Sequence, residues 1–282
     1  QAAEFRSKKR STTVRWNACL MHGRPWTLVH TSDVHLESRF TTDTAGEYRN
    51  GAERAFAAVV QVALDESADL ILIVGDLVGN NRVPDEGFEF VCNQLQRLSC
   101  STVLLPGNHD VHDDYSVWYR IELATAGNHV HAVLDHRGDI IEFPELGARV
   151  WGKAMAEHAP ENAPLAGTPE PVADGWNIGL AHGQVVEKRA GIGSSQITKE
   201  EIRNSGFDYL ALGHVHVWGD KSAGATTACY PGSPVAAYAS ASGGHVAIAR
   251  LSADAGVSVT QHLVDRQREQ RGVEDPLAGI AI

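Results

Sequence analysis

The residues of this chain that could do chemistry lie in five short polar clusters, and each cluster directly follows a run of apolar residues. The clusters are Asp33-Val34-His35, Gly75-Asp76, Gly107-Asn108-His109-Asp110, His182-Gly183 and Gly213-His214-Val215-His216. They offer two Asp carboxylates, four His imidazoles and one Asn amide oxygen as metal ligands. This nitrogen and oxygen set suits Mn²⁺, Fe or Zn²⁺ better than Ca²⁺ or copper. Because seven protein ligands exceed what one such ion takes, the set favours a dinuclear centre with a shared carboxylate.

Each cluster has an ordinary explanation when it is read alone. Asp-x-His after a strand can be a turn with an exposed histidine, Gly-Asp usually marks a turn, and His182 could be a hydrogen-bonded core or surface histidine. The polar residues of Gly-Asn-His-Asp are poorly suited to packing in an apolar core. His214 and His216 would point to the same side if their strand continued. Because all five clusters stand at strand ends of one chain, we interpret them together as a metal site.

The elements that must position these clusters alternate between strands and helices. Apolar and β-branched runs predict strands over residues 27–31, 69–74, 102–105, 176–181, 209–212, 245–251 and 257–262. Apolar residues at helical spacing predict helices over 53–66, 88–98 and 198–205. This alternation is typical of a layered α/β fold, in which side chains at the carboxyl ends of parallel strands meet at one edge. The stretch 157–174, with four prolines, is predicted to be a surface loop.

The composition is that of an ordinary globular protein: 282 residues, 43% hydrophobic and 21% charged. No stretch approaches the roughly 20 consecutive apolar residues of a membrane-spanning helix. The four cysteines are scattered and form no Cys-x-x-Cys pair, which argues against a thiolate zinc site and predicts reduced thiols. We therefore expect a cytoplasmic protein with no membrane partner, and no feature indicates its oligomeric state.

The net charge of −11 is unevenly distributed along the chain. Residues 1–26 hold six basic side chains and one acidic one, which leaves 18 basic and 34 acidic groups, a net charge of −16, in the rest. Such an acidic body repels the phosphate backbone of nucleic acids. We predict a basic extension over residues 1–25, either disordered or not native to the protein, a folded catalytic domain over 26–265, and a tail over 266–282.

The ordered clusters resemble the motifs of the calcineurin-like metallophosphoesterases, which are D-x-H, G-D, G-N-H-[DE], a lone His and G-H-x-H. The resemblance covers residues 27–235. Within this family, the segments 30–36, 209–216 and 230–234 look most like those of the Mre11- and SbcD-like DNA repair nucleases. The implied fold is an α/β, four-layer αββα sandwich, in which two mixed β-sheets are flanked by helices.

The resemblance also implies a role for each site residue. It divides the ligands into two groups, with the carboxylate of Asp76 as the bridge between two metal ions. One ion would be held by Asp33, His35 and His216, and the other by Asn108, His182 and His214. His109 would not be a ligand, because it resembles the family's histidine that contacts the substrate phosphate or protonates the leaving oxygen. Asn108 would contact substrate as well.

A physical account of this arrangement stands beside the resemblance. Two cations roughly 3.5–4 Å apart can lower the pKa of a bridging water and neutralise the charge that builds up in an in-line displacement. A histidine, with an ordinary pKa of roughly 6.5, can donate a proton to the departing alkoxide. We expect a phosphodiesterase in which a metal-bridging hydroxide attacks and His109 assists the leaving group; a purely electrostatic His109 is the alternative. Manganese is the first expectation for the ions, with Fe or Zn²⁺ as alternatives.

Two departures from the family bear on the substrate. Gly79 stands where many relatives carry a further Asp, so His109 needs another orienting group. The SbcD-like nucleases also have a capping region that engages DNA, whereas the residues after His216 are expected to form only closing strands and a tail. The leading hypothesis is therefore a phosphodiesterase for small or exposed diesters, and the alternative is a Mn-dependent DNA exonuclease or endonuclease. A phosphomonoesterase and a non-catalytic scaffold rank below both.

The substrate pocket is the part of the site that the sequence defines least. Four residues that follow the Gly-Asn-His-Asp turn either border the substrate, with Trp118 or Tyr115 as a stacking face, or belong to a surface loop with Trp118 packed beneath it: His112, Asp113, Tyr115 and Trp118. Lys188 and Arg189 are either phosphate contacts or part of a solvated turn.

Overall fold

The computed structural model describes residues 25–36, 50–120, 123–189, 191, 193–236 and 244–265. Nearly all of the predicted basic extension, residues 1–24, and the whole predicted tail, residues 266–282, lie outside the described residues. The division of the chain into these three segments therefore stays a prediction.

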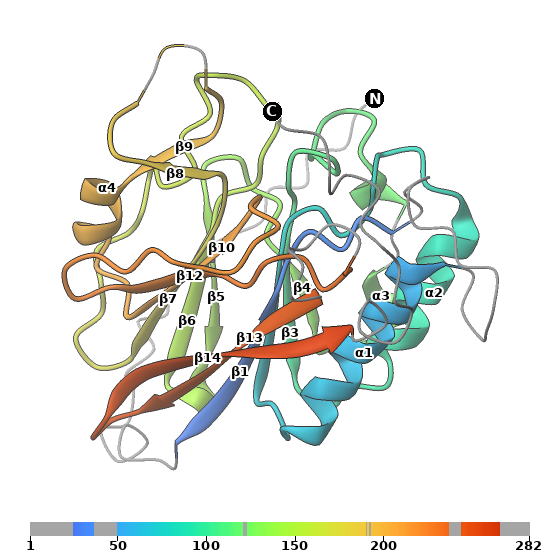
Figure 1. Cartoon of the computed structure of the whole chain (residues 1–282), viewed down its shortest axis with the longest axis horizontal. Helices are drawn as coiled ribbons and strands as arrows, with labels where there is room; N and C mark the ends of the chain where they lie inside the picture. Colours follow the sequence, from blue (N-terminus) through green and yellow to red (C-terminus); the bar gives the residue numbers. More distant parts are fainter. Residues whose placement is uncertain are drawn as a thin grey trace, which may run out of the picture.

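Two six-stranded mixed sheets form the centre of the molecule (Figure 1). The first has the order β14-β13-β1-β2-β3-β4, with β1 to β4 parallel and β13 and β14 antiparallel. Its strands are β1 Trp26–Thr31, β2 Leu70–Val74, β3 Ser101–Leu105, β4 Val130–Ala132, β13 Gly244–Ser252 and β14 Gly256–Asp265.

The second sheet has the order β11-β12-β10-β7-β6-β5, in which the four central strands are parallel and both edge strands antiparallel. Its strands are β5 Asp139–Phe143, β6 Ala148–Gly152, β7 Trp176–His182, β10 Tyr209–Gly213, β11 Gly219–Asp220 and β12 Thr227–Tyr230. A separate parallel ribbon joins β8 Gln184–Val186 to β9 Gln196–Thr198.

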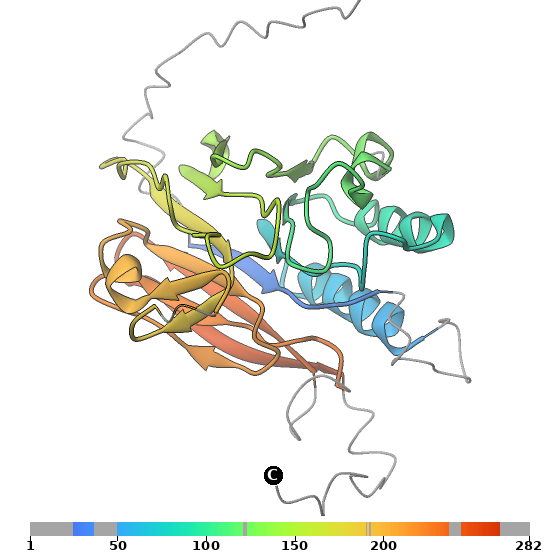
Figure 2. The same cartoon turned by 90° about the horizontal axis from the view of Figure 1, so that it is seen from above.

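Helices cover the outer faces of both sheets. The helices α1 Gly51–Asp65, α2 Asp85–Leu95 and α3 Leu123–Ala126 lie on the side of the first sheet, and α4 Lys199–Arg203 lies on the opposite side of the molecule (Figures 1 and 2). Two short 3₁₀ turns, Val117–Tyr119 and Pro144–Leu146, complete the described elements. The predicted sandwich of two mixed sheets with flanking helices is confirmed.

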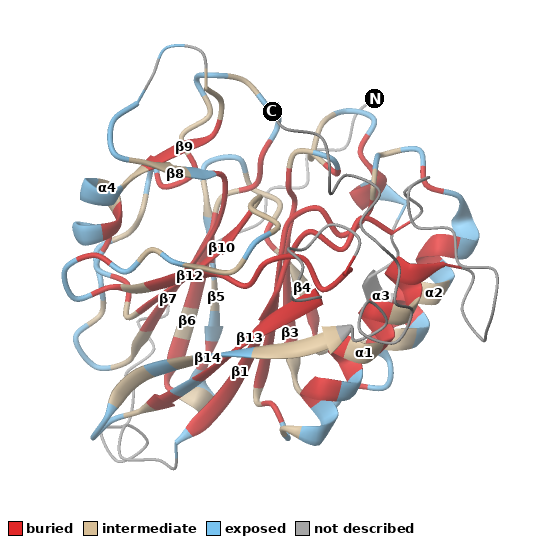
Figure 3. Cartoon of the chain, viewed as in Figure 1, coloured by how far each residue is buried: buried red, intermediate tan, exposed pale blue. Residues whose placement is uncertain are grey.

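The alternation of side chains along β2 shows why the strands are buried on both faces. Leu70, Leu72 and Val74 pack into the core between the two sheets, whereas Ile71 and Ile73 pack under α1 and α2. Because successive side chains point to opposite faces, an uninterrupted apolar run is required of a strand covered on both sides. Figure 3 shows the central strands of both sheets buried, whereas the edge strands β5 and β14 and the outer surface of α4 are mostly intermediate or exposed.

The helix boundaries follow from local capping. Asn50 accepts a 3.0 Å hydrogen bond from the Glu53 backbone N–H at the start of α1, which satisfies one of the free donors of the first turn. Thr198 and Glu201 form a reciprocal capping box on α4. The three predicted helices are confirmed with boundaries shifted by a few residues, although the last predicted turn of α2, up to Leu98, lies beyond the helix.

Strands β4, β5, β6 and β12 and the short β8, β9 and β11 were not among the predicted strands. Most of them are short, and the residues of β5 are largely exposed, so neither apolar runs nor strict alternation marks them. The described cysteines, Cys92, Cys100 and Cys229, are free thiols. Within the described residues, helices fall short of the length and apolar content needed to cross a membrane.

A buried polar chain joins the two sheets. His30 on β1 lies 2.9 Å from the Tyr209 hydroxyl, which is 3.3 Å from Cys229 Sγ. Burial lowers the pKa of His30 to about 3, so the imidazole is neutral in the folded protein at ordinary pH. The unfolded chain binds a proton at this histidine below its ordinary pKa of about 6.5, and acid therefore favours unfolding.

We predict that acidification from pH 7 to pH 5 destabilises the metal-free protein by about 2 kcal/mol through His30 alone. Urea unfolding at both pH values, in a chelator, measures this difference. His30→Gln should remove that part of the pH dependence, whereas His262→Gln, on the edge strand β14, should retain it. Identical pH dependence in the parent and in His30→Gln would contradict the assignment.

Candidate metal centre

All eight residues of the predicted site come together at one edge of the sandwich. Loops that follow β1, β2 and β3 of the first sheet bring five of them, the last residue of β7 is His182, and the turn after β10 brings two. The parallel pairing of β1 with β2, of β2 with β3, and of β7 with β10 places these strand ends side by side. The expectation that the strand-end clusters converge is confirmed.

The first group of predicted ligands is closely spaced. His35 Nε2 lies 3.1 Å from His216 Nε2, and His216 Nε2 lies 3.5 Å from Asp33 Oδ1. Their ligand atoms all lie within 4.8 Å of one another, as do those of the overlapping groups that include Asp76. Two imidazole nitrogens that face each other beside a carboxylate form a donor set suited to a cation.

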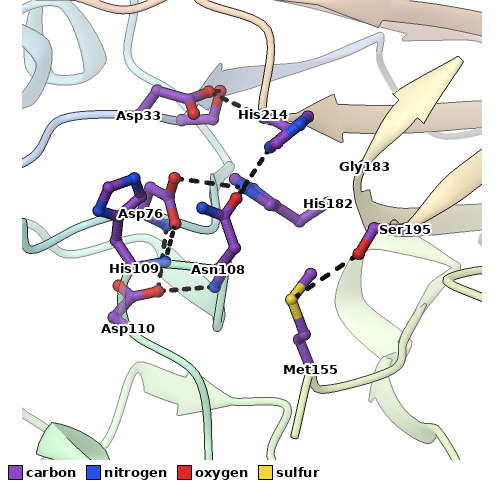
Figure 4. A network of polar contacts seen from close by, with 12 residues as sticks. Asp33, Asp76, Asn108, His109, Asp110, Met155, His182, Gly183, Ser195 and His214 are labelled. Carbon is purple, nitrogen blue, oxygen red and sulfur yellow. Dashed lines mark hydrogen bonds and ion pairs between the residues drawn. The ribbon is translucent and has the colours of Figure 1, made fainter. Parts of the chain in front are cut away.

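The second group surrounds the Asn108 amide oxygen (Figure 4). This oxygen lies 3.1 Å from His182 Nε2 and 2.8 Å from His214 Nδ1. The other ring nitrogen of His182, Nδ1, lies 2.8 Å from the Val74 carbonyl oxygen. Because a carbonyl can only accept, Nδ1 donates a hydrogen bond to Val74, and Nε2 is the ring nitrogen that faces Asp76 and Asn108.

Asp76 stands between the two groups. Its Oδ2 lies 3.4 Å from His182 Nε2 and 3.9 Å from His35 Nε2, while Oδ1 accepts a 2.8 Å hydrogen bond from the His109 backbone N–H. The Asp76 carboxylate therefore faces a histidine of each predicted ligand group.

The backbone of the site is strained where the predicted ligands sit. Six described residues other than glycine have a left-handed φ, and four of them are Asp33 (57°), His35 (52°), Asp76 (54°) and His214 (96°). Each such residue costs of order 1–3 kcal/mol, and such strain persists mainly at functional sites. The strand β10 ends at Gly213, so His214 and His216 reach the site from a turn and not from the continued strand that their spacing suggested.

The electrostatics of the cluster fit bound cations. Asp33 Oδ1 is buried and accepts no hydrogen bond from the described residues, and burial raises the pKa of Asp33. Burial lowers the pKa of His35 and of His214 to about 4 each, so both imidazoles are neutral, as metal binding needs. Burial opposes ionisation of Asp76, but the neighbouring His182 holds the Asp76 pKa well below its usual range. Two divalent cations would compensate the buried carboxylates.

Asp110 is a supporting residue whose role the sequence analysis did not assign. Its buried carboxylate accepts hydrogen bonds from the backbone N–H groups of Asp76 (3.1 Å), Leu77 (2.8 Å) and Gly107 (2.6 Å). It therefore fixes the strained turn that carries Asp76. The signal was its place as the last residue of the Gly-Asn-His-Asp cluster.

Ser233 links the two turns of the first ligand group in the same way. Its hydroxyl donates a 2.7 Å hydrogen bond to the Asp33 carbonyl, and its N–H donates a 2.9 Å hydrogen bond to the His216 carbonyl. Ser233 belongs to the Tyr-Pro-Gly-Ser-Pro segment that entered the family resemblance without a role of its own.

The missing carboxylate at position 79 is replaced by a backbone group. His109 Nδ1 lies 3.1 Å from the Gly79 carbonyl oxygen, which can only accept a hydrogen bond. The ring is therefore oriented with Nδ1–H toward the backbone, and Nε2 is the nitrogen that can carry a transferable proton. The orienting group that His109 needs is the main chain at Gly79.

The residues considered for the substrate pocket differ in burial and in their contacts. Trp118 is only 4% exposed and donates a 2.6 Å hydrogen bond from Nε1 to the Asp110 carbonyl, so it packs beneath the loop. Tyr115 is 87% exposed. Arg189 forms a 2.6 Å ion pair with Glu201 on α4, which engages it away from a phosphate.

Close backbone approaches at the site predict a large effect for one glycine. Gly75 has φ +82°, and a Cβ there would lie 2.1 Å from His182 Nδ1 and 2.8 Å from Gly107 Cα. We predict that Gly75→Ala lowers the free energy of unfolding by about 3 kcal/mol or more, from clash and backbone strain together. Gly256 is the matched control, because it has φ +73° and no described atom lies within 4 Å of the point that a Cβ would occupy. Gly256→Ala should cost only about 1 kcal/mol, and equal losses in urea unfolding would contradict the prediction.

The chain belongs to the calcineurin-like phosphoesterase family, whose sequence pattern matches residues 27–218. It is 25% identical to the uncharacterized metallophosphoesterase YhaO of Bacillus subtilis (strain 168) over 221 residues, which are 75% of this chain and 54% of YhaO. It is 30% identical over 83 residues to a probable cyclic nucleotide phosphodiesterase of Coxiella burnetii, covering 29% of this chain and 31% of that protein. The chain thus spans about half the length, or less, of these relatives.

Solved structures share the fold. Protein TT1561 of Thermus thermophilus superposes with a TM-score of 0.55 at 16% identity, over 86% of this chain and all of that one. A dimetal phosphatase from Danio rerio gives a TM-score of 0.54 at 13% identity, over 85% of this chain and 99% of that one. At these identities the likeness concerns the fold alone. The particular resemblance to repair nucleases stays a prediction.

Proposed function

We propose that this chain is a dinuclear metal-dependent phosphodiesterase that acts on small or exposed phosphodiesters. The observation that carries the proposal is the position of Asp76, whose carboxylate faces His35 in one ligand group and His182 in the other. Asp33, His35 and His216 would hold one cation, and Asn108, His182 and His214 the other. Manganese is the proposed metal, and a cytoplasmic location is part of the same proposal.

Different residues of the site would bind the metal ions, contact the phosphate and transfer a proton. When bound, two divalent cations supply an activated water and neutralise charge on the phosphate oxygens. Asn108 and His109 would contact the phosphate from the same turn. His109, with Nδ1–H held by the Gly79 carbonyl, would protonate the leaving oxygen from Nε2.

Two observations favour a small diester as the substrate. The chain has a net charge of −16 over residues 27–282, which disfavours a long polyanion. The partial likeness to a probable cyclic nucleotide phosphodiesterase supports the same substrate class. The second candidate is a Mn-dependent DNA exonuclease or endonuclease, which the likeness of segments 30–36, 209–216 and 230–234 to repair nucleases favours.

One experiment separates these candidates. The purified protein with Mn²⁺ is assayed in parallel on bis(p-nitrophenyl) phosphate, p-nitrophenyl phosphate, a cyclic nucleotide and end-labelled linear DNA. We expect the small diesters to be cleaved fastest and Asp76→Asn to remove the activity, which excludes a contaminating enzyme. Faster cleavage of DNA than of small diesters would favour the nuclease, and preference for p-nitrophenyl phosphate would favour a monoesterase.

A further inference from the structure

A histidine outside the family motifs borders the candidate metal centre. The exposed ring of His158 lies edge-on to the ring of His214, with a centroid distance of 5.8 Å and an interplanar angle of 66°. On the other ligand group, the ring of His109 meets His35 in the same manner, at 4.7 Å and 87°. Two histidines that are not proposed ligands therefore flank the centre, one beside each ligand group.

His158 belongs to the proline-rich stretch after β6, and this stretch is held firmly at several points. Lys153 Nζ donates a 3.0 Å hydrogen bond to the Ala163 carbonyl, and Asn162 Nδ2 donates a 2.8 Å bond to Ser195 Oγ. Leu165 is buried in the apolar cluster on the outer face of the second sheet. These contacts anchor the loop around His158 next to the candidate metal centre.

A second segment fixes the imidazole itself. The Ser194 hydroxyl is hydrogen-bonded to His158 Nε2. Ser194 is placed by its neighbour Ser195, whose carbonyl accepts a 3.0 Å hydrogen bond from the Gln184 N–H and would lie 2.1 Å from a Cβ on Gly183. The segment therefore lies directly against the end of β7, next to His182. Figure 4 shows Ser195 with Met155, three residues before His158, in the same close-up as the ligand cluster.

The Ser194 contact bears on which ring nitrogen of His158 is available. The hydroxyl can donate to Nε2 or accept from it, and when it donates the ring hydrogen lies on Nδ1. No described residue accepts a hydrogen bond from this Nδ1–H, and the exposed ring has little packing of its own to maintain. A phosphate group between the two ligand groups would offer acceptor oxygens to this donor, on the side opposite His109.

We propose that His158 is a substrate-binding residue that donates a hydrogen bond to an oxygen of the phosphoryl group, and that Ser194 is the residue that positions its ring. This inference rests on the proposed function, because it assumes that a phosphate binds between the ligand groups. It adds to the site a contact from the loop between β6 and β7, which the strand-end motifs do not include.

The test measures phosphate binding as well as turnover. Isothermal titration calorimetry with inorganic phosphate on the Mn-loaded protein gives the Kd, and bis(p-nitrophenyl) phosphate gives kcat and KM. For His158→Ala we expect about a tenfold weaker Kd and a similar rise in KM, the loss of one good hydrogen bond to a charged group, with kcat within about threefold of the parent. Ser194→Ala should show about a threefold loss, and His158→Gln should recover part of the affinity, since an amide can still donate.

Controls make each outcome decisive. Glu157→Gln, at the exposed neighbour in the same loop, should bind phosphate as the parent does, and manganese content should stay at the parent value in every variant. An unchanged phosphate Kd in His158→Ala, or loss of manganese from it, would overturn the proposal. Phosphate binding does not need turnover, so a parent protein that cleaves no phosphodiester would refute the proposed function while the Kd comparison still decides the role of His158.

Discussion

Replacement of Asp76 by asparagine is expected to lower the hydrolysis rate of bis(p-nitrophenyl) phosphate by at least about a thousandfold. The reason is geometric: a single buried carboxylate faces His35 at 3.9 Å and His182 at 3.4 Å, one in each ligand group. Asparagine keeps the size of the side chain but removes the charge, so both proposed cations lose their shared anionic ligand. The manganese content of the dialysed variant should fall below that of the parent.

The fold of this variant should survive, because Asp110 holds the turn through the Asp76 backbone N–H, and the side-chain oxygen of the introduced asparagine can still accept the hydrogen bond from the His109 N–H. Circular dichroism and urea unfolding check this point. Asp114→Asn, at an exposed aspartate on the loop after the same cluster, is the matched control and should behave as the parent. Parent-like activity together with parent-like metal content in Asp76→Asn would exclude the bridging role.

Replacement of His109 by alanine is expected to lower kcat by about 10²–10⁴-fold, the usual contribution of a general acid, while the manganese content stays at the parent value. His109 lies beside the centre, with its ring against His35 and its Nδ1 engaged by the Gly79 carbonyl. It can therefore act on the substrate without holding a cation. Stopped assays and metal analysis on the same preparation provide both numbers.

The leaving group separates the two roles considered for His109. A general acid matters most when the departing oxygen is a poor leaving group, so His109→Ala should lose more activity on an unsubstituted phenyl or alkyl diester than on a p-nitrophenyl diester. A purely electrostatic role predicts the same loss on both. Loss of a metal ion from the variant would make His109 a ligand instead.

The ligand cluster could be predicted because the change from apolar to polar residues marks each strand end in this sequence. Each apolar run stops at a turn-forming or polar residue, namely Ser32, Gly75, Pro106, His182 or Gly213, and parallel pairing then brings those ends to one edge. What the spacing could not provide was the backbone conformation. His214 has φ 96° in a turn after β10, so the even spacing of His214 and His216 reflects no continued strand.

The residues that support the cluster were harder to find from the sequence. Asp110 and Ser233 act through backbone groups of Asp76, Asp33 and His216, and such contacts join segments far apart in the chain. His158 lies in a stretch without periodicity, and its place beside His214 depends on anchors such as Asn162 to Ser195. Contacts of this kind depend on tertiary packing, which cannot be predicted from a local sequence pattern.

The most direct test of the account is the hydrolysis of bis(p-nitrophenyl) phosphate measured as a function of bound manganese. The metal-free protein is equilibrated with increasing Mn²⁺, and metal content and rate are determined on the same samples. We expect two ions per chain at saturation and activity that rises with occupancy of the second ion. Full activity in the metal-free protein, or saturation of both binding and rate at one ion per chain, would contradict it.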